Sequence, residues 1–264
     1  MADIRKTAAL IEETEKLAEG ICGLWLRPEA PEVAVSAVPG QFVLVYCRDA
    51  SRLLPRPISL CEIDRERGRL RLVYRIAGAG TRELSERKAG ETIEIMGPLG
   101  NGYSLEGLPA DGGHAVLMGG GIGIPPLLAL ARALPGVRTA VLGYRDGETF
   151  LREEFEALGC RVIIATDDGS IGTKGNVIDA ARENAVRGDM IYSCGPVPMQ
   201  RGVKAYAAEL GIPAQLSLEE RMACGIGACL ACVCQSREKD SHSHVHNKRV
   251  CKDGPVFFAD EIEL

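Results

Sequence analysis

Four cysteines near the C-terminus have the spacing of an iron–sulfur ligand set. Three lie in one short run and the fourth follows at a distance: Cys224, Cys229, Cys232 and Cys251. A C-x4-C-x2-C run with a distant fourth cysteine is typical of plant-type 2Fe–2S ferredoxins. Two bridged irons need four thiolates in one small volume, so three come from a single wrapped loop and one closes the site from elsewhere. The spacing therefore predicts a 2Fe–2S cluster, and with it the transfer of one electron at a time.

The residues around these cysteines allow other interpretations to be weighed. Gly225 and Gly227 lie inside the cysteine loop, where we expect them to adopt unusual dihedrals and let the backbone approach the sulfides. A zinc site would show paired C-x2-C units or Cys/His pairs, and only Cys229 and Cys232 form such a pair. Disulfides are not expected, because the sequence shows no signal peptide and cytosolic thiols stay reduced. We expect Cys234 not to be a ligand.

A histidine-rich tract lies between the third and fourth of these cysteines, at His242, His244 and His246. Such tracts can bind metal. Here the histidines are mixed with Ser, Lys and Asp, and no closed ligand set surrounds them. We interpret the tract as a solvated loop.

Length, composition and charge limit the class of protein. At 264 residues the chain has room for about two domains and a small appendage. Its content of 46% hydrophobic and 25% charged residues is ordinary for a globular protein. The net charge of −5 gives no indication of binding to nucleic acid or to an anionic membrane. The uncharged stretch 115–131 contains several Gly and Pro residues and is shorter than the ~20 residues of a membrane span, so we expect a soluble, cytoplasmic protein.

The pattern of predicted elements changes along the chain. Residues 20–108 contain short strand-like runs separated by Gly and Pro, which predicts a closed β barrel with a brief helix at 81–88. Propensity leaves open whether 7–20 is a helix or a strand. Residues 112–213 alternate between strands and helices, which predicts parallel β structure with crossover helices, a nucleotide-binding fold.

The remainder of the chain is predicted to be a cluster domain too small to be stable without its metal. The predicted fold class is a β barrel plus an α/β nucleotide-binding domain, with a small C-terminal 2Fe–2S domain. We place the barrel domain at 1–110, the α/β domain at 111–213 and the cluster domain at 214–264.

A glycine-rich turn lies between a predicted strand and a predicted helix. Its glycines are Gly119, Gly120, Gly121 and Gly123. Such a turn can direct backbone amides and a helix N-terminus at a pyrophosphate, although glycines in these turns are often only structural. Prolines at 125–126 replace the end of the G-x-G-x-x-G pattern, which points away from ordinary dehydrogenases.

A second motif, Cys194, Gly195 and Pro196, follows a late predicted strand. Ligands in open α/β sheets bind beyond the carboxyl ends of strands, so this motif could lie against a nicotinamide ring. The alternative is a buried cysteine followed by a proline that begins a helix.

A third signal lies in the predicted barrel, where RPIS at 56–59 precedes VYRIAGAGT at 73–81. An arginine can neutralise a phosphate, a hydroxyl can bond a flavin nitrogen, and Gly-Thr can supply donors to a pyrophosphate. Taken singly, a strand arginine is usually a surface residue and Gly-x-Gly-Thr is usually a turn.

Taken in this order, RPIS, GGGIGIPP and CGP resemble the ferredoxin–NADP reductase superfamily, in which a barrel binds FAD and an α/β domain binds a nicotinamide nucleotide. With ERMACGIGACLACVC and VCKDGPVF added, the chain resembles the electron transfer subunits of dihydroorotate dehydrogenase B over residues 20–264. The resemblance implies that FAD is held by Arg56, Pro57, Ile58, Ser59, Val73, Tyr74, Arg75, Gly80 and Thr81. It implies that the nicotinamide nucleotide meets Gly119, Gly120, Gly121, Gly123, Cys194, Gly195 and Pro196. The wider superfamily usually has Tyr where this chain has Ile58, so stacking of an aromatic ring on that flavin face is not implied.

The same resemblance implies a partner and a pathway, the biosynthesis of pyrimidines (UMP). A separate FMN-containing catalytic subunit would oxidise dihydroorotate, in a heterotetramer with two copies of each chain. Electrons would run from FMN to the 2Fe–2S cluster, to FAD and finally to NAD. This chain would then need no general base. The choice of NAD over NADP follows from the resemblance alone, because Arg145 and Asp146 favour opposite answers.

Two other functions fit parts of the sequence. One is the small subunit of an NADH-dependent ferredoxin–NADP oxidoreductase or sulfide dehydrogenase, a group similar in all three parts that typically has Asp at the first ligand position. Cys224 argues against it. The other is a zinc-stabilised binding module without redox function, which a yellow-brown protein as isolated would exclude.

Overall fold

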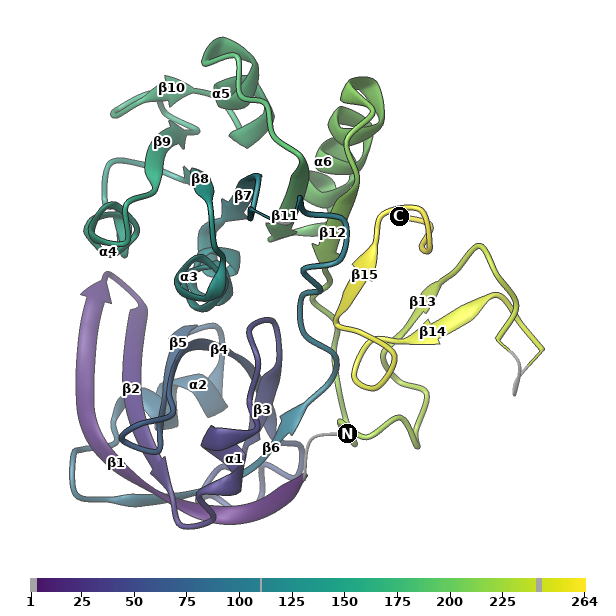
Figure 1. Cartoon of the computed structure of the whole chain (residues 1–264). Helices are drawn as coiled ribbons and strands as arrows, with labels where there is room; N and C mark the ends of the chain where they lie inside the picture. The colour runs from purple at the N-terminus through teal and green to yellow at the C-terminus, as the bar shows by residue number, and fades with distance from the viewer. Residues whose placement is uncertain (1–3, 110, 241–243) are drawn as a thin grey trace.

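The computed structural model describes residues 4–109, 111–240 and 244–264. Its N-terminal half is a closed barrel in the order β1-β2-β5-β4-β3-β6, which confirms the predicted barrel (Figure 1). All strand pairs in it are antiparallel. The strands are β1 (Arg5–Ala18), β2 (Ile21–Pro28), β3 (Phe42–Val45), β4 (Arg56–Asp64), β5 (Arg69–Arg75) and β6 (Thr92–Leu99). Two short helices, α1 (Glu32–Val35) and α2 (Ala79–Ser85), lie between them in the chain.

The N-terminal segment, which propensity left undecided, is the long strand β1. Ala9 and Ile11 are fully buried in the barrel, whereas Leu10 between them is 40% exposed. This alternation is the period-two pattern of a strand with one face on the core. Pairing with both β2 and β6 satisfies the backbone groups of β1, so tertiary context decides the conformation.

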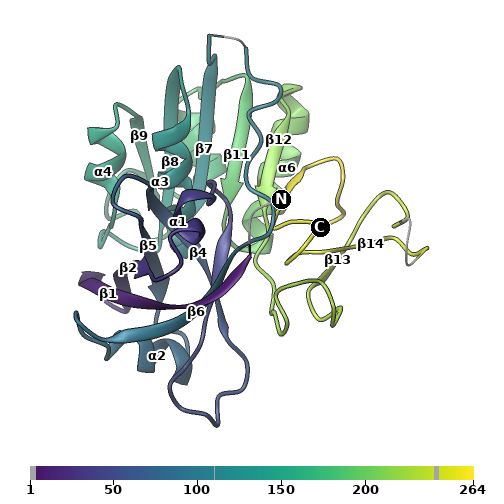
Figure 2. The ribbon, with the colours of Figure 1, turned by 60° about the horizontal axis from the view of Figure 1, so that its bottom comes forward.

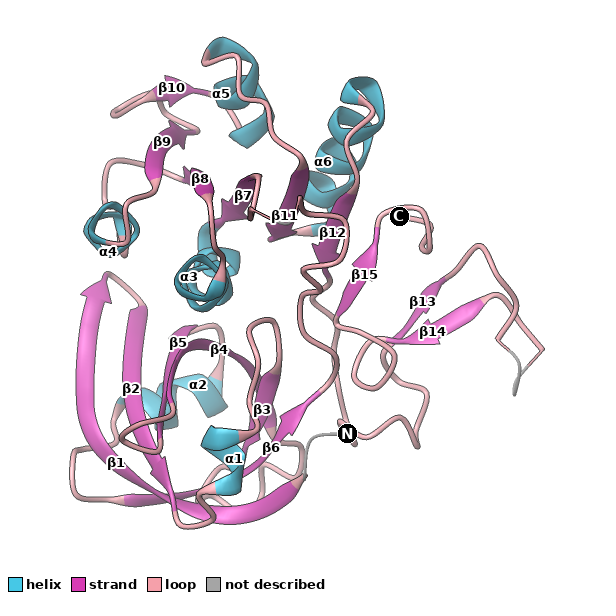
Figure 3. Ribbon diagram, viewed as in Figure 1, coloured by secondary structure: helices cyan, strands magenta, loops and turns pink. Residues whose placement is uncertain are grey.

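The second half is the predicted α/β unit, with helices on both faces of a mostly parallel sheet (Figure 3). The sheet order is β10-β9-β8-β7-β11-β12-β15. Its strands are β7 (His114–Gly120), β8 (Val137–Tyr144), β9 (Arg161–Thr166), β10 (Thr173–Lys174), β11 (Met190–Cys194), β12 (Ala214–Ser217) and β15 (Val256–Phe258). The helices are the 3-10 turn η1 (Gly121–Gly123), α3 (Ile124–Ala133), α4 (Arg152–Ala157), α5 (Val177–Glu183) and α6 (Val197–Leu210).

The C-terminal part is tied to this sheet. Strand β15 pairs antiparallel with β12 at the sheet edge. Before it, β13 (Val233–Gln235) and β14 (Asn247–Arg249) form a two-stranded hairpin that projects to the side of the molecule in both views (Figures 1 and 2). The division into three domains at 110 and 213 stays a prediction.

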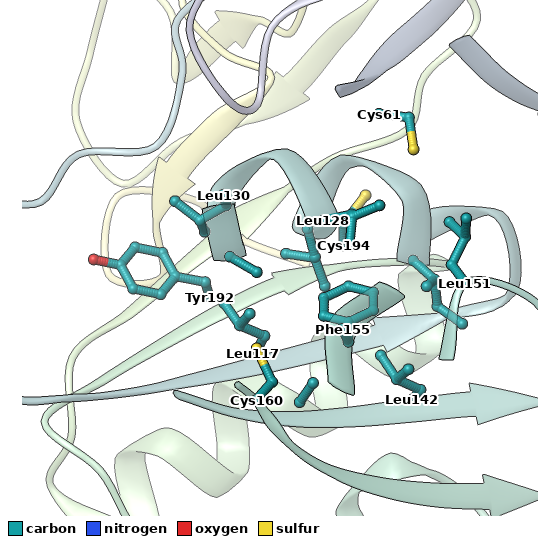
Figure 4. Close-up of a cluster of buried hydrophobic side chains, with 14 of the residues drawn as sticks. Cys61, Leu117, Leu128, Leu130, Leu142, Leu151, Phe155, Cys160, Tyr192 and Cys194 are labelled. Atoms are coloured by element: carbon teal, nitrogen blue, oxygen red, sulfur yellow. The ribbon is translucent and has the colours of Figure 1, made fainter. Parts of the chain in front are cut away.

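One buried cluster joins the barrel to the α/β unit. It contains Cys61 and Val73 from the barrel together with Leu127 and Leu128 of α3. Figure 4 shows Cys61 at one edge of this cluster, with Leu128 on the helix and Phe155 further inside. Because α3 packs on both the sheet and β4, the two halves share apolar surface. Within the described residues, no helix is both long enough and apolar enough to cross a membrane.

Candidate functional site

The four predicted ligand cysteines lie together. The sulfur of Cys251 accepts a hydrogen bond from the backbone N–H of Gly227 at 3.1 Å, and the sulfur of Cys232 accepts one from the N–H of Cys251 at 3.4 Å. The side chains of Cys224 and Cys229 interact, as do those of Cys232 and Cys251. The sulfurs therefore form two neighbouring pairs, one within the cysteine loop and one between the loop and the distant cysteine.

The environment of Cys224 favours a thiolate. Burial would raise its pKa, but hydrogen bonds from the backbone N–H groups of Ile226 and Cys229 lower it to about 6. The N–H of Ala228 also points at this sulfur, at 3.3 Å. Since the thiolate is the form that binds iron, the backbone prepares this residue for a metal.

Two glycines shape the cysteine loop. Gly225 and Gly227 have φ angles of 71° and 82°, which confirms the predicted unusual dihedrals. A Cβ on Gly225 would lie 2.5 Å from a methyl carbon of Leu44 in β3, and one on Gly227 would lie 2.7 Å from Cδ of Lys252. The loop is thus packed between the barrel and the segment that carries Cys251, and a side chain at either glycine would displace it.

Cys234 differs from these four cysteines. It lies on β13, and its pKa is raised to about 11, first by burial and then by Glu220. The side chains that shift its pKa are Glu220 and Lys248, and no other cysteine is among them.

The histidine tract is described only in part, because His242 lies outside the described residues. His244 is exposed, and Nδ1 of His246 lies 2.8 Å from the carbonyl oxygen of Arg237. In the described part of the chain, no three His, Cys, Asp or Glu side chains converge on a single metal ion, and the four cysteines meet only as the two pairs described above.

The cysteine loop presents apolar side chains to solvent. Ile226 and Leu230 are 50% and 53% exposed, and Cys229 between them is also exposed. Met222, by contrast, packs against the core. A contiguous exposed apolar patch marks a surface for another protein, and these two side chains are candidates for such a patch beside the cysteines.

In the barrel, Arg56 and Gly80 lie against each other at the start of α2. A Cβ on Gly80 would lie 2.1 Å from Nε of Arg56, so a side chain at this position would push the guanidinium aside. Arg56 forms no ion pair with any residue that the structure describes, although it donates a hydrogen bond to the carbonyl of Leu54. Thr81 holds the turn, because its hydroxyl accepts hydrogen bonds from the N–H groups of Ala77 and Gly78 at 2.9 and 3.1 Å. The result is an uncompensated cation beside a helix start.

The other predicted flavin residues lie at different depths. The side chains of Ile58 and Tyr74 are buried in the barrel core, and Val73 is buried in the cluster shared with the α/β unit. Ser59 is half-buried, whereas Pro57 and Arg75 are exposed. The hydroxyl of Tyr74 is buried without a hydrogen-bond partner among the described residues, and burial raises its pKa.

The glycine-rich turn and the CGP motif, far apart in the sequence, meet in the structure. Cys194 lies beside Gly119 in the pairing of β11 with β7. A Cβ on Gly123 would lie 2.3 Å from the carbonyl oxygen of Cys194, and one on Gly195 would lie 3.3 Å from the nitrogen of Gly120. Burial raises the pKa of the Cys194 thiol, so it stays neutral. Pro196 is the N-cap of α6.

A cavity of about 1180 Å³ opens between the barrel and the α/β unit. Its barrel wall includes Ala18, Ile21 and Arg75, and its α/β wall includes Gly121 and Pro196. A Cβ on Gly121 would lie 2.9 Å from a guanidinium nitrogen of Arg75, so the glycine-rich turn and the barrel approach each other there. The cavity is large enough for a dinucleotide and lies beyond the carboxyl ends of the parallel strands, where ligands bind in such sheets.

Several residues that line this cavity were not among the predicted site residues, including Asp167, Met199 and Glu219. Met199 would collide with a side chain at Gly120, at 2.5 Å from its sulfur. Removal of water from around its carboxyl group raises the pKa of Glu219, although the nearby charge of Arg75 acts to lower it. Asp167 follows the carboxyl end of β9, and that position was a signal in the sequence. Met199 lies in the segment that begins with the CGP motif, whereas Glu219 reaches the cavity only through tertiary packing.

Two family descriptions match the chain. Residues 8–103 match "Oxidoreductase FAD-binding domain", and residues 219–263 match "Iron-sulfur cluster binding domain of dihydroorotate dehydrogenase B". The barrel is therefore an FAD-binding domain, and the C-terminal part is an iron–sulfur cluster binding domain.

Two similar curated proteins from different bacteria carry the same description. The chain is 47% identical over 231 residues to the electron transfer subunit of dihydroorotate dehydrogenase B (NAD(+)) of Geobacillus kaustophilus, covering 86% of this chain and 87% of the relative. It is 44% identical over 235 residues to the subunit of the same description from Fusobacterium nucleatum, with the same coverage.

Among solved structures, an NADH-dependent reduced ferredoxin–NADP oxidoreductase studied for flavin-based electron bifurcation is 32% identical, with a TM-score of 0.84. The match covers 97% of this chain and 89% of the chain of that oxidoreductase. A cytochrome P450 reductase of Amycolatopsis is 24% identical, with a TM-score of 0.66 over 79% of this chain and 67% of the other, and shows the fold alone.

Proposed function

Because the chain belongs to the family of electron transfer subunits of dihydroorotate dehydrogenase B, we propose that it conducts electrons from an FMN-containing catalytic subunit, through a 2Fe–2S cluster and FAD, to NAD in the cytoplasm. The 47% identity over 86% of the chain carries this proposal. Bound FAD exchanges electrons singly with a cluster and in pairs with a nicotinamide. The residues of this chain bind and orient the three groups, and the pathway they serve is pyrimidine (UMP) biosynthesis.

We propose that Cys224 and Cys229 hold one iron and that Cys232 and Cys251 hold the other. The pairing of the four sulfurs supports this assignment, because a bridged cluster needs two thiolates for each iron. A single tetrahedral zinc would need all four to converge on one point.

We propose that Arg56 and Gly80 hold the FAD diphosphate and that Ser59 and Arg75 lie near its ring. The uncompensated guanidinium at the start of α2 supports the diphosphate site. Of the remaining assigned residues, Pro57 is exposed, Thr81 holds the turn, and Val73 is buried in the cluster that the barrel shares with the α/β unit. Ile58 and Tyr74 support the strands from inside the barrel.

Replacing Arg56 with alanine should weaken FAD binding by about tenfold to a hundredfold. The reason is the loss of charge-assisted hydrogen bonds to the diphosphate, worth about 1.5–3 kcal/mol. Equilibrium dialysis with fluorescence detection of FAD measures the change. Arg52→Ala is the matched control, because Arg52 is ion-paired with Glu83 at 3.1 Å. Equal losses in both variants, or acid release of FMN instead of FAD from the native protein, would contradict the assignment.

We propose that the cavity binds NAD, with the nicotinamide near Cys194, Gly195 and Pro196 and the pyrophosphate on the glycine-rich turn of Gly119, Gly120, Gly121 and Gly123. Of the charged side chains that line the cavity, six are acidic and three are basic. The acidic ones are Glu19, Asp146, Glu148, Asp167, Asp179 and Glu219, and the basic ones are Arg75, Arg145 and Arg182. This excess of carboxylates opposes the additional phosphate of NADP.

Replacing Asp167 with asparagine should raise the rate with NADPH relative to NADH by about fivefold to tenfold. Its carboxylate forms no hydrogen bond or ion pair with the described residues. The repulsion between this exposed carboxylate and a phosphate charge 4 Å away would be about 1 kcal/mol. Steady-state reduction of an artificial acceptor measures the ratio. Asp168→Asn is the control, because that carboxylate accepts from the N–H and hydroxyl of Ser170 at 2.9 and 2.6 Å. An unchanged ratio for Asp167→Asn would remove this residue from the specificity argument.

A second candidate is the small subunit of a bifurcating oxidoreductase, favoured by the structural match with a TM-score of 0.84. Cys224 opposes it, because we expect Asp at that position in the bifurcating group. Purification of the native protein with its partner, followed by mass spectrometry, tests the two. An FMN-containing dihydroorotate dehydrogenase subunit, in a complex of two copies of each chain, is the expected partner. A different flavoprotein would favour the bifurcating candidate.

A further inference from the structure

Arg71 in β5 is the buried centre of a network of ion pairs. Only 5% of its side chain is exposed. Its guanidinium lies 2.8 Å from a carboxylate oxygen of Glu15 in β1, 2.8 Å from Glu62 in β4 and 2.6 Å from Glu154 in α4. The second oxygen of Glu62 lies 2.7 Å from Arg132 of α3. We call these five residues the Arg71 network.

The network crosses from the barrel to the α/β unit twice. Arg71, Glu15 and Glu62 belong to barrel strands, whereas Glu154 and Arg132 belong to helices of the α/β unit. Figure 1 shows the β1–β2 hairpin rising to end beneath α4. The neighbouring Arg69 in β5 provides a contrast, because its partners Glu12, Glu13 and Asp64 are all in the barrel.

The energetics of such a network favour a role in orientation rather than in stability. Removing charges from water costs about as much as their mutual attraction returns, so buried ion pairs add little net stability. The shared apolar cluster already holds the two halves together, but apolar contacts are not directional. Charged hydrogen bonds have defined geometry and fix the register of two surfaces. The network therefore specifies how the α/β unit sits on the barrel.

The same elements form the walls of the cavity. Glu15 lies in β1, which ends at Ala18, and Ala18 and Glu19 both line the cavity. Glu154 lies in α4, shortly after Phe150, which also lines it. At the rim, the N–H of Glu19 donates to a carboxylate oxygen of Glu148 at 2.8 Å, a further polar contact between the two halves. A shift at the network would therefore move one cavity wall against the other.

We propose that the Arg71 network is a positioning device that sets the distance between the flavin on the barrel and the nicotinamide in the cavity, and so governs the speed of hydride transfer between them. This inference rests on the proposed function. It assigns no bond-making step to these residues. They act by holding two binding sites in register, and misplacement of reacting groups by about 1 Å can cost about a hundredfold in rate.

The double variant Glu154→Gln with Arg132→Gln tests the proposal, because both residues are partly exposed, at 36% and 52%, and leave the barrel carboxylates and Arg71 in place. We expect the limiting rate of flavin reduction by NADH, measured by anaerobic rapid mixing, to fall by about tenfold or more. The long-wavelength charge-transfer absorbance of the flavin–nicotinamide pair should fall with it. FAD and iron content should be unchanged.

The matched control is the double variant Arg152→Gln with Glu156→Gln, which breaks an ion pair of 2.9 Å on the same helix that does not reach the barrel. In this control, NADH should reduce the flavin at the native rate. The conservative single variant Arg132→Lys should keep most of the native rate of flavin reduction. Native rates in the test variant, or equal losses in the control, would overturn the proposal. Should the test variant lose FAD, the rate of the single variant Arg132→Gln decides instead.

Hydrogen–deuterium exchange on the full chain separates this proposal from the proposed function. Amides of residues 18–21 and 148–151 should exchange faster in the test variant than in the control, because both segments lie at the junction of the two halves. If these segments of the test variant exchange at the native rate, the positioning role is refuted, whatever NADH does to the native protein. If NADH does not reduce the native protein, the proposed function is refuted instead.

Discussion

A chain in which Cys232 is replaced by alanine is expected to lose its iron and the visible absorption of the cluster, while a chain with Cys234→Ala keeps both. Removing a thiolate leaves an open coordination position on one iron, so the cluster is lost rather than weakened. The same loss is expected for Cys224, Cys229 and Cys251. Iron and sulfide assays, together with electron paramagnetic resonance of the reduced protein, measure the outcome.

Cys234 is the matched control because it is half-buried in the same region, and the side chains that shift its pKa are Glu220 and Lys248 rather than another cysteine. Retention of FAD in every variant would show that the barrel still folds. Our assignment would be refuted if Cys234→Ala lost the iron while Cys251→Ala kept it. One zinc per chain in the native protein would instead establish the zinc-binding alternative.

The second large effect concerns the division of labour between subunits. The isolated chain is expected to pass electrons from NADH to artificial acceptors and to leave dihydroorotate unoxidised. The barrel, the α/β unit and the cluster region account for the described chain, and the cavity between them has the dimensions of a dinucleotide site. Addition of the FMN-containing catalytic subunit should create dihydroorotate-dependent reduction of NAD, measured at the absorbance of NADH. Oxidation of dihydroorotate by this chain alone would disprove the arrangement.

The surface that receives those electrons can be tested separately. Ile226→Glu with Leu230→Glu places two charges in the exposed apolar surface beside Cys229. If this surface meets the catalytic subunit, binding should weaken by about thirtyfold or more, because losing one well-packed hot-spot residue at an interface centre costs about 2 kcal/mol or more. Val137→Glu, at an exposed apolar residue on β8, is the control. NADH-driven reduction of artificial acceptors should be unchanged in all of these variants. Native affinity in the double variant would move the docking surface elsewhere.

The sequence alone determined the features that depend on local spacing. The intervals between the four cysteines indicate an iron–sulfur ligand set, because one wrapped loop can present only certain spacings to a cluster. The positive φ of Gly225 and Gly227 was also predictable, since a loop folded tightly around sulfides needs residues without a Cβ. The change from short, Gly-punctuated strands to strand–helix alternation likewise predicted the barrel and the α/β unit, because hydrophobic periodicity follows local geometry.

Tertiary structure alone decided the features that depend on which distant segments meet. Residues 5–18 form a strand because β2 and β6 flank them, although their propensity fits a helix as well. The cavity combines Arg75, Asp167 and Glu219 from segments with no common sequence pattern. The Arg71 network joins β1, β4, β5, α3 and α4, and its arginine is indistinguishable from Arg69 by local pattern. Local pattern encodes which face of an element is apolar, whereas the partner of a given charge is fixed only when packing brings two faces together.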